Sequence, residues 1–385
     1  MELTNKIINS FLALCASAAL GACGMYLYNK DKIELAEECN LVSECKKILE
    51  SEKVELPENA DVNEAVLRGY LTAYDDKYTF YTSKTNDDET YLASVNGMSC
   101  LVTCGYRVGL TDDGRIEVVN VTAGSVAEKQ GLKTGDIILS IDGEVIAEKG
   151  IVPTALNLSG KDGTEMKLVI ERNGKKTNLN FLRSNDYDKQ VENVMMKVDN
   201  RILYVKISSV DNYLYASYND KLQEINSGYD KIIIDLRDNV GGLTEGSVQF
   251  ADSFIGDGHV DLYYKTGKKE VLNTYDSVDD CKMPMVVLCN EHTASAAEIL
   301  TALLKQYGED VSLVGAKTFG KGIFQREKEL STGGRVRYTA GYYTVGDWEC
   351  YHEIGIKPDV EVEMDSSFIG TDKDIQLEKA YEILG

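Results

Sequence analysis

The hydrophobic positions in the first part of the chain repeat with the period of an α-helix. Val62, Val66 and Tyr70 stand four residues apart, which places them on one face of a helix. The charged residues around this apolar face are mostly acidic. We therefore expect residues 31–96 to form an N-terminal helical region.

Short strands and turns replace the helical period in residues 97–185. The hydrophobic runs 137–141 and 166–171 each have the length of a β-strand. The pairs Asp142-Gly143 and Asn173-Gly174 follow these runs and favour tight turns. The pattern predicts a small β-rich module.

Strands and helices alternate in residues 186–385. Such βαβ alternation is typical of helices packed on a largely parallel sheet. The fold class that we expect is therefore α/β and multidomain, with an N-terminal helical segment, the β-rich module and a layered α/β core. The strands are expected at 202–207, 232–236, 285–289 and 311–314, and the helices at 214–225 and 296–307.

A hydrophobic segment occupies much of residues 1–30. The 22 residues from Ile7 to Tyr28 carry no charge, and about 20 apolar residues are enough to cross a bilayer as a helix. We expect a signal-anchor that holds a single-pass protein in the cell membrane with its body extracytoplasmic. The alternatives are a cleaved signal peptide, which gives a secreted protein, and a lipoprotein anchored through Cys23.

The net charge of the chain bears on which classes of partner we expect. Lysine and arginine number 41 against 63 aspartate and glutamate residues, a formal net charge of -22. Nucleic acid is itself a polyanion, so we expect no nucleic-acid partner. The sequence has neither paired CxxC motifs nor an HExxH helix, so we expect no metal site and no cofactor. A homo-oligomer is compatible with the sequence.

The chain contains nine cysteines, which raises the question of disulfides. An extracytoplasmic location would permit them. Cys39 with Cys45, and Cys100 with Cys104, are close enough in sequence to pair if the geometry allows. The sequence leaves this pairing open.

Ser295 has the setting of a nucleophile. The strand expected at 285–289 ends in a short polar loop, and a helix begins just after the serine. The free N–H groups of a helix N-terminus, that of Ala296 among them, could stabilise an oxyanion formed when the serine attacks a carbonyl. A serine at this position is also a common helix N-cap, so the segment alone does not decide between the two roles.

Lys321 stands between Gly320 and Gly322 in a loop after the strand expected at 311–314. A lysine can serve as a general base when apolar surroundings keep it neutral. A lysine between glycines is otherwise a solvated loop residue, and the pattern by itself favours that interpretation.

A double glycine, Gly241-Gly242, follows the strand expected at 232–236. Glycines allow a backbone turn whose N–H groups point inward, which suits a second oxyanion donor. A tight turn between a strand and a helix would explain the same residues without catalysis.

Taken together, these three segments resemble those of the carboxyl-terminal processing proteases, also called tail-specific proteases. They occur in that family's order and spacing, and the resemblance covers nearly the whole chain beyond the hydrophobic segment. Residues 124–143 look like the PDZ segment of these enzymes, and residues 355–359 also agree. The resemblance implies a PDZ-like domain at 97–185 and a serine protease catalytic domain at 186–385.

The resemblance also implies catalytic roles. Ser295 aligns with the family's nucleophile, Lys321 with its general base, and Gln325 with the glutamine that orients the lysine. The N–H groups of Ala296 and of the Gly241-Gly242 turn would form the oxyanion hole. The implied function is a serine endopeptidase that cleaves extracytoplasmic protein or peptide substrates.

The PDZ-like domain would select those substrates. Such domains add an extended peptide to a strand and bind its C-terminal carboxylate in a nest of backbone N–H groups, which the resemblance places at Cys104, Gly105 and Tyr106. The family's glycine-rich loop keeps only Gly105 here, because Thr103 and Cys104 replace its neighbours. Ser159 stands where relatives commonly carry arginine, so peptide preference and regulation can differ from theirs.

Other interpretations use the same residues. A peptide-binding scaffold with an inactive catalytic domain would not need all three of Ser295, Lys321 and Gln325. An esterase would be expected to carry a GxSxG turn at its serine, which this chain lacks. His292 has no evident carboxylate partner and is not expected to be catalytic. We attribute Glu298, in the first turn of the helix, to favourable interaction with the helix dipole.

Overall fold

The structure is a computed structural model that describes part of the chain. The described residues are 42–51, 53, 62–76, 78–82, 101–102, 104–111, 115–121, 125–146, 158, 163–183, 194–211, 214–225, 228–275, 282–331 and 333–385. The anchor or signal predicted for residues 1–30 lies outside them. Among the helices that are described, none is long and apolar enough to span a bilayer.

The chain divides into two compact units, residues 1–63 and 64–385. In the first unit the structure describes a helix at 42–51, whose side chains are all exposed. The helix expected from the spacing of Val62, Val66 and Tyr70 is confirmed as α2 (Val62–Thr72). The arrangement of the second unit decides where the predicted catalytic residues lie.

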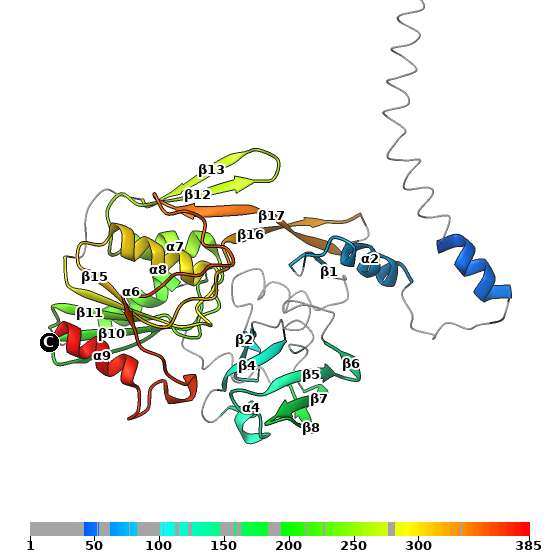
Figure 1. The fold of residues 1–385 in the computed structure, drawn as a ribbon, viewed down its shortest axis with the longest axis horizontal. Coiled ribbons are helices and arrows are strands. Elements are labelled where there is room, and N and C mark those ends of the chain that lie inside the picture. Colours follow the sequence, from blue (N-terminus) through cyan, green and yellow to red (C-terminus); the bar gives the residue numbers. More distant parts are fainter. Residues whose placement is uncertain are drawn as a thin grey trace, which may run out of the picture. The chain divides into compact units, whose positions relative to one another are not determined.

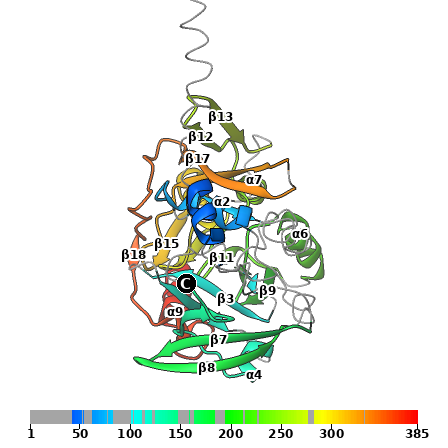
Figure 2. The same ribbon diagram turned by 90° about the vertical axis from the view of Figure 1, so that its right-hand side faces the viewer.

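The β-rich module is a seven-stranded antiparallel sheet with its own apolar core. Both residues of the Asp142-Gly143 and Asn173-Gly174 turns have positive φ, which a two-residue hairpin of this kind requires. The short helix α4 (Val126–Lys129) is capped by Ser125, whose Oγ accepts a hydrogen bond from the Glu128 N–H. Figure 2 shows the long β7–β8 hairpin at the edge of this sheet. The strands are β2 (Leu101–Val102), β3 (Tyr106–Leu110), β4 (Ile116–Val121), β5 (Ile137–Ile141), β6 (Glu144–Val145), β7 (Glu165–Arg172) and β8 (Lys175–Leu182).

The second part of this unit is built on a six-stranded sheet, as the βαβ pattern predicted (Figure 1). Its strands run parallel except for β9, which pairs antiparallel with β10 at one edge. In sheet order the strands are β18 (Val360–Glu361), β15 (Val311–Gly315), β14 (Met285–Cys289), β11 (Lys231–Asp235), β10 (Ile202–Ile207) and β9 (Val194–Asp199).

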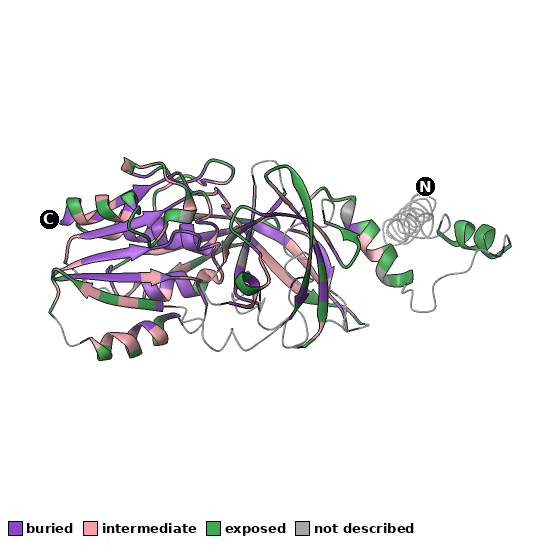
Figure 3. Cartoon of the chain, turned by 90° about the horizontal axis from the view of Figure 1, so that it is seen from below, coloured by how far each residue is buried: buried purple, intermediate pink, exposed green. Residues whose placement is uncertain are grey.

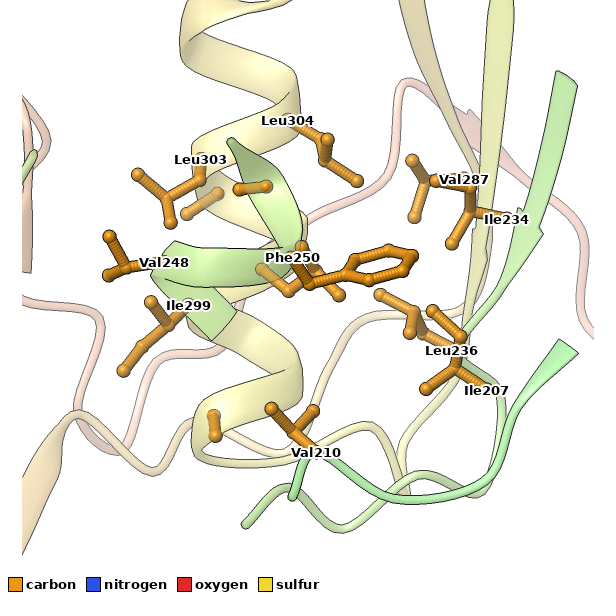
Figure 4. Packing of buried hydrophobic residues seen from close by; sticks show 14 of the residues in the cluster. Ile207, Val210, Ile234, Leu236, Val248, Phe250, Val287, Ile299, Leu303 and Leu304 are labelled. Carbon is orange, nitrogen blue, oxygen red and sulfur yellow. The ribbon is translucent and has the colours of Figure 1, made fainter. Parts of the chain in front are cut away.

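Helices cover both faces of the six-stranded sheet, which explains why successive residues of its central strands are mostly apolar. Ile232 and Ile234 of β11 join one apolar cluster, and Ile233 between them joins the cluster on the opposite face. The first cluster is formed with α6 (Leu214–Glu224), α7 (Thr244–Ala251) and α8 (Ala296–Tyr307), and the second with α9 (Ile375–Leu384). Figure 3 shows these strands as almost continuously buried, and in Figure 4 Phe250 of α7 fills the space between α8 and the sheet.

A second sheet of five antiparallel strands was not anticipated from the sequence. The long strand β17 lies at its centre and pairs with two strands that are distant in the chain and with the strand just before it (Figure 1). The strands are β1 (Phe80–Thr82), β12 (His259–Tyr264), β13 (Lys269–Asn273), β16 (Ile323–Glu329) and β17 (Arg335–Val345). This sheet brings the segment before β1 and the strand after Lys321 to the same strand, β17.

The structure describes only one cysteine of each disulfide pairing considered from the sequence. Cys45 is an exposed free thiol. Cys104 is fully buried in the core of the β-rich module, and its Sγ lies 4.0 Å from the carbonyl oxygen of Leu182. Their proposed partners, Cys39 and Cys100, lie outside the described residues.

Candidate active site

The candidate site begins where two neighbouring parallel strands end. The loops after β11 and β14 are joined by hydrogen bonds from the Asp238 N–H to Asn290 Oδ1 (3.0 Å) and from Asn290 Nδ2 to Asp238 Oδ1 (2.7 Å). The Ala294 N–H donates to the Asn239 carbonyl at 3.0 Å. Carboxyl ends of adjacent parallel strands are the usual place for a site in such folds. The double glycine and the loop that carries Ser295 are therefore held side by side.

Ser295 has a backbone conformation that is unusual for a residue with a side chain. Its φ of 56° and ψ of -120° lie outside the regions that L-residues normally occupy. The residue comes at the abrupt change from the loop after β14 to helix α8. Strain of this kind persists when the surroundings fix the backbone, and it concentrates at functional sites. Ser295 also forms a capping box with Glu298 at the start of α8, so the unusual backbone is what points to a functional role in addition to the cap.

Gly241 packs directly against this turn. A Cβ atom at Gly241 would lie 2.6 Å from the Ala294 oxygen, 2.7 Å from the Ala296 nitrogen and 2.9 Å from the Ser295 Cβ. Its φ of 100° is also one that glycine adopts readily. Only a glycine fits this position without moving the serine turn.

The two glycines predicted as oxyanion donors differ in their hydrogen bonds. The Gly241 N–H already donates to Asn239 Oδ1 at 2.9 Å. Within the described part of the chain, the N–H groups of Gly242 and Ala296 donate to no residue. The role of these residues as oxyanion donors stays a prediction.

Glu298 connects the serine turn to the lysine loop. Its side chain is completely buried, with 0% of the residue exposed. One oxygen accepts hydrogen bonds from the N–H groups of Ser295 (2.9 Å) and Lys321 (2.8 Å). The other accepts from Thr318 Oγ1 (2.6 Å) and the Gly320 N–H (2.7 Å). The helix-dipole explanation given from the sequence is therefore insufficient, because four donors from two loops meet on this one carboxylate.

Burial of Glu298 has an electrostatic cost. Loss of water raises the pKa of its carboxyl group above the ordinary value, although the hydrogen bonds from Thr318 and from the Lys321, Gly320 and Ser295 N–H groups act in the opposite direction. The four hydrogen bonds that Glu298 accepts from the two loops offset this cost.

The glycines on either side of Lys321 are required by a close approach of another loop. A Cβ at Gly320 would lie 2.8 Å from the Gly355 nitrogen, and one at Gly322 would lie 2.7 Å from the His352 nitrogen. The Lys321 carbonyl accepts a hydrogen bond from the hydroxyl of Tyr343 on β17. The lysine backbone is thus fixed on both sides, and the loop is not the solvated one that its glycines first suggested.

Comparison with known proteins supports this assignment of the fold. Residues 201–362 match the model of Peptidase family S41, and residues 102–182 match that of the PDZ domain. The carboxy-terminal processing protease CtpA of Bacillus subtilis is 33% identical over 308 residues, which cover 78% of this chain and 64% of that protein. These matches support the carboxyl-terminal processing protease family for this chain. The family resemblance stated from the sequence is confirmed.

Other members of the family and their structures agree. A CtpA-like serine protease of Staphylococcus aureus is 29% identical over 311 residues, covering 80% of this chain and 61% of that protein. The chain thus spans less than two thirds of the length of these relatives. The structure of a photosystem II D1 C-terminal processing protease has the same fold, with a TM-score of 0.66 and 24% identity over 88% of this chain and 90% of that one.

Gln325, which family resemblance pairs with the lysine, lies on β16 beside a break in the β16–β17 register. Its Nε2 is buried and has no hydrogen-bond partner among the described residues. A buried donor of this kind is costly unless a group enters the site to accept from it. The role of Gln325 beside Lys321 stays a prediction.

A buried ion network lies behind the double-glycine loop, and sequence reasoning did not identify it as part of the site. Arg237 donates to both oxygens of Asp235, and also to both oxygens of Asp374 at the start of α9, at 2.7 and 2.9 Å. The guanidinium also donates to Gln376 Oε1 at 3.1 Å. These bonds fix the strand end that leads into Gly241-Gly242. Only the Asp-Leu-Arg sequence at the end of a buried strand could have indicated it.

The residues predicted to bind peptide belong to the β-rich module. The side chains of Cys104 and Tyr106 are buried in its core, and Gly105 between them has a φ of 83°. Any contact with a peptide carboxylate at this loop would therefore come from backbone N–H groups rather than from these side chains. The peptide-binding role of the three residues stays a prediction.

Proposed function

We propose that this chain is a serine endopeptidase in which Ser295 is the nucleophile and Lys321 the general base. The observation that carries the proposal is the shared carboxylate of Glu298, which binds the N–H groups of both residues. Residues that are only structural would not need one buried carboxylate to hold a strained serine turn against a lysine loop. The matches to the protease family support the same roles.

The proposed reaction follows from these positions. Ser295 Oγ attacks the peptide carbonyl carbon, and its proton passes to the neutral amine of Lys321. The N–H groups of Ala296 and Gly242 stabilise the oxyanion of the tetrahedral intermediate. The C–N bond then breaks as Lys321 gives the proton to the leaving amine. Water, deprotonated by Lys321, attacks the acyl-enzyme, and the released proton returns to Ser295 Oγ.

The PDZ domain supports a peptide substrate over a small ester. We infer that it binds an extended or C-terminal peptide segment by strand addition at the loop of Cys104, Gly105 and Tyr106. This arrangement would present an unfolded or flexible region of a protein to the catalytic domain.

The uncharged segment Ile7–Tyr28 leads us to propose that the protein works outside the cytoplasm on protein substrates. Single-pass anchoring is the version that we favour. Fractionation of cells that produce the full chain tests it: recovery with the membrane after an alkaline wash supports the anchor, and recovery in the medium contradicts it.

Activity is tested with wild type, Ser295→Ala and Lys321→Ala on an unfolded protein such as reduced, fluorescein-labelled casein. We expect cleavage by wild type and a loss of at least about 1,000-fold in both variants. His292→Ala is the matched control, because it changes the same loop without removing a proposed catalytic group. Equal inactivity of wild type and both variants, with all folded, would support the scaffold interpretation instead.

A further inference from the structure

A tyrosine from the N-terminal part of the second unit contacts the proposed general base. The ring centroid of Tyr78 lies 4.5 Å from Lys321 Nζ. Tyr78 is 5% exposed, although it stands in a short connection between α2 and β1. Family resemblance assigned no role to Tyr78. Neither this connection nor the strand β1 that follows it belongs to the six-stranded sheet.

The connection that carries Tyr78 is itself fixed. Asp76 accepts hydrogen bonds from the Tyr78 N–H (3.0 Å) and from Thr79 Oγ1 (2.7 Å), which holds the turn before β1. Burial alone would raise the pKa of Asp76, but its hydrogen bonds, that from Thr79 foremost, outweigh burial and keep the pKa below the ordinary value. The next residues pair with β17, beginning with Phe80 opposite Arg337.

Strand β17, which pairs with β1, also contacts the lysine backbone. Tyr343 of β17 donates its hydroxyl hydrogen to the Lys321 carbonyl. The Lys321 N–H donates to Glu298. These two bonds fix the lysine backbone and leave its long side chain to be positioned by what surrounds the amine. The ring of Tyr78 supplies a surface at that end of the side chain.

The phenol group of Tyr78 is not suited to accept a proton itself. Burial, followed by the charges of Asp76, Glu298 and Glu353, raises its pKa well above the ordinary value. The hydroxyl therefore stays protonated wherever the protein is folded and active. The contact with Lys321 is made by the ring, so the inference rests on the ring.

The ring acts on the amine in two opposing ways. Its electron-rich face attracts an ammonium ion, which favours the charged form. Its bulk keeps water away, which favours the neutral form. Other titratable groups also surround the lysine loop: Glu298 from α8, Tyr343 from β17, and Cys350, His352 and Glu353 from the loop after β17.

We propose that Tyr78 is a positioning residue of the peptidase site, whose ring places the amine of Lys321 toward Ser295 and shields it from water. This inference rests on the proposed roles of Ser295 and Lys321. It also gives a function to the segment before β1, which would then complete the catalytic site from outside the layered sheet.

The test compares Tyr78→Phe, Tyr78→Leu and Tyr78→Ala in the full chain, with casein as substrate and the pH dependence of kcat/KM as the main readout. Phenylalanine keeps the ring, so we expect kcat within about threefold of wild type and an unchanged pH profile. Alanine admits water, so we expect about a tenfold lower kcat and an acidic limb displaced to higher pH. Leucine keeps the apolar bulk without the aromatic face, so its acidic limb should move to lower pH.

Tyr81→Leu is the matched control, because Tyr81 is also a buried tyrosine of this segment but lies against Gly334. A merely structural role would lower the rate through the folded fraction and leave the pH profile in place. The inference is overturned if the acidic limb stays at the wild-type position in every folded Tyr78 variant. The proposed function fails separately, and this inference with it, if wild type itself cleaves no faster than Ser295→Ala.

Discussion

Lys321 and Glu298 are joined by a hydrogen bond of 2.8 Å from the lysine N–H to a carboxylate oxygen that also accepts from Ser295. The bond involves the backbone N–H of the proposed base rather than its amine. Glu298 therefore determines where the lysine loop stands relative to the serine turn. Most of the chemistry predicted for this protein depends on that separation.

Glu298→Gln should reduce kcat/KM by at least about 100-fold. Each oxygen of Glu298 accepts from two donors, so an amide NH₂ at either position would face two hydrogen-bond donors. Steady-state kinetics and labelling of Ser295 by a fluorophosphonate measure the effect. Glu245→Gln is the control, because Glu245 is an exposed acid in the first turn of α7. Similar small losses in both variants would restore the helix-dipole explanation.

Gly241→Ala should abolish most of the activity and lower the free energy of unfolding by about 1–3 kcal/mol. The new methyl group would meet the backbone of Ala294 and Ala296 at less than 3 Å. Gly267→Ala is a matched control, because Gly267 has a φ of 85° and no atom within 4 Å of its would-be Cβ. The comparison separates backbone strain from the clash. Equal activity of the two variants would contradict a tight fit at Gly241.

Acid should weaken the protein through Asp235. Burial would raise the pKa of Asp235, but the charge and hydrogen bonds of Arg237 outweigh burial and hold it at about 2. A depressed pKa stabilises the fold above the unfolded value near 4, and this contribution is lost as pH falls toward 2. It amounts to about 2–3 kcal/mol.

Urea unfolding of wild type and Asp235→Asn between pH 5 and pH 2 measures this contribution. The stability of the variant should fall less steeply with acid than that of wild type. Asp230→Asn is the control, since Asp230 forms an exposed ion pair with Arg201. A wild-type curve parallel to that of Asp235→Asn would show that Asp235 does not carry the acid sensitivity.

Cysteine reactivity should follow burial. Burial, with a smaller contribution from nearby carboxylates, raises the pKa of Cys289 to about 12, so little thiolate exists at neutral pH. Iodoacetamide at pH 8 should label the exposed Cys45 in minutes and reach Cys289 only after unfolding. Mass spectrometry of the digested protein reads out each site. Labelling of Cys289 in the native protein at the rate of Cys45 would contradict the buried position.

The parts of the site that lie in one local segment were accessible from the sequence. The strand before Ser295, the helix after it and the double glycine all carry local patterns of hydrophobicity and turn formation. The parallel sheet could be predicted for the same reason, since each βαβ unit is continuous in the chain. Ser295, Ala296 and Gly242 come from these segments.

What the sequence could not supply are the contacts between distant segments. Glu298 was attributed to the helix dipole because three of its donors, at Thr318, Gly320 and Lys321, belong to another loop. No local sequence pattern pointed to a role for Tyr78, because its contact with Lys321 joins residues that are far apart in the chain. The second sheet was missed because β17 pairs with β1 and β12, which no local turn connects to it.

The pairing of Arg237 with Asp374 has a consequence for the order in which the protein is made. Asp374 is synthesised after both Ser295 and Lys321. A nascent chain that has just passed Lys321 already contains the proposed nucleophile and base, but the guanidinium of Arg237 still lacks the carboxylate that will bind both of its outer nitrogens. Docking of α9 is therefore the step that completes the buried ion network behind the double glycine, after the segments of Ser295 and Lys321 have both been synthesised.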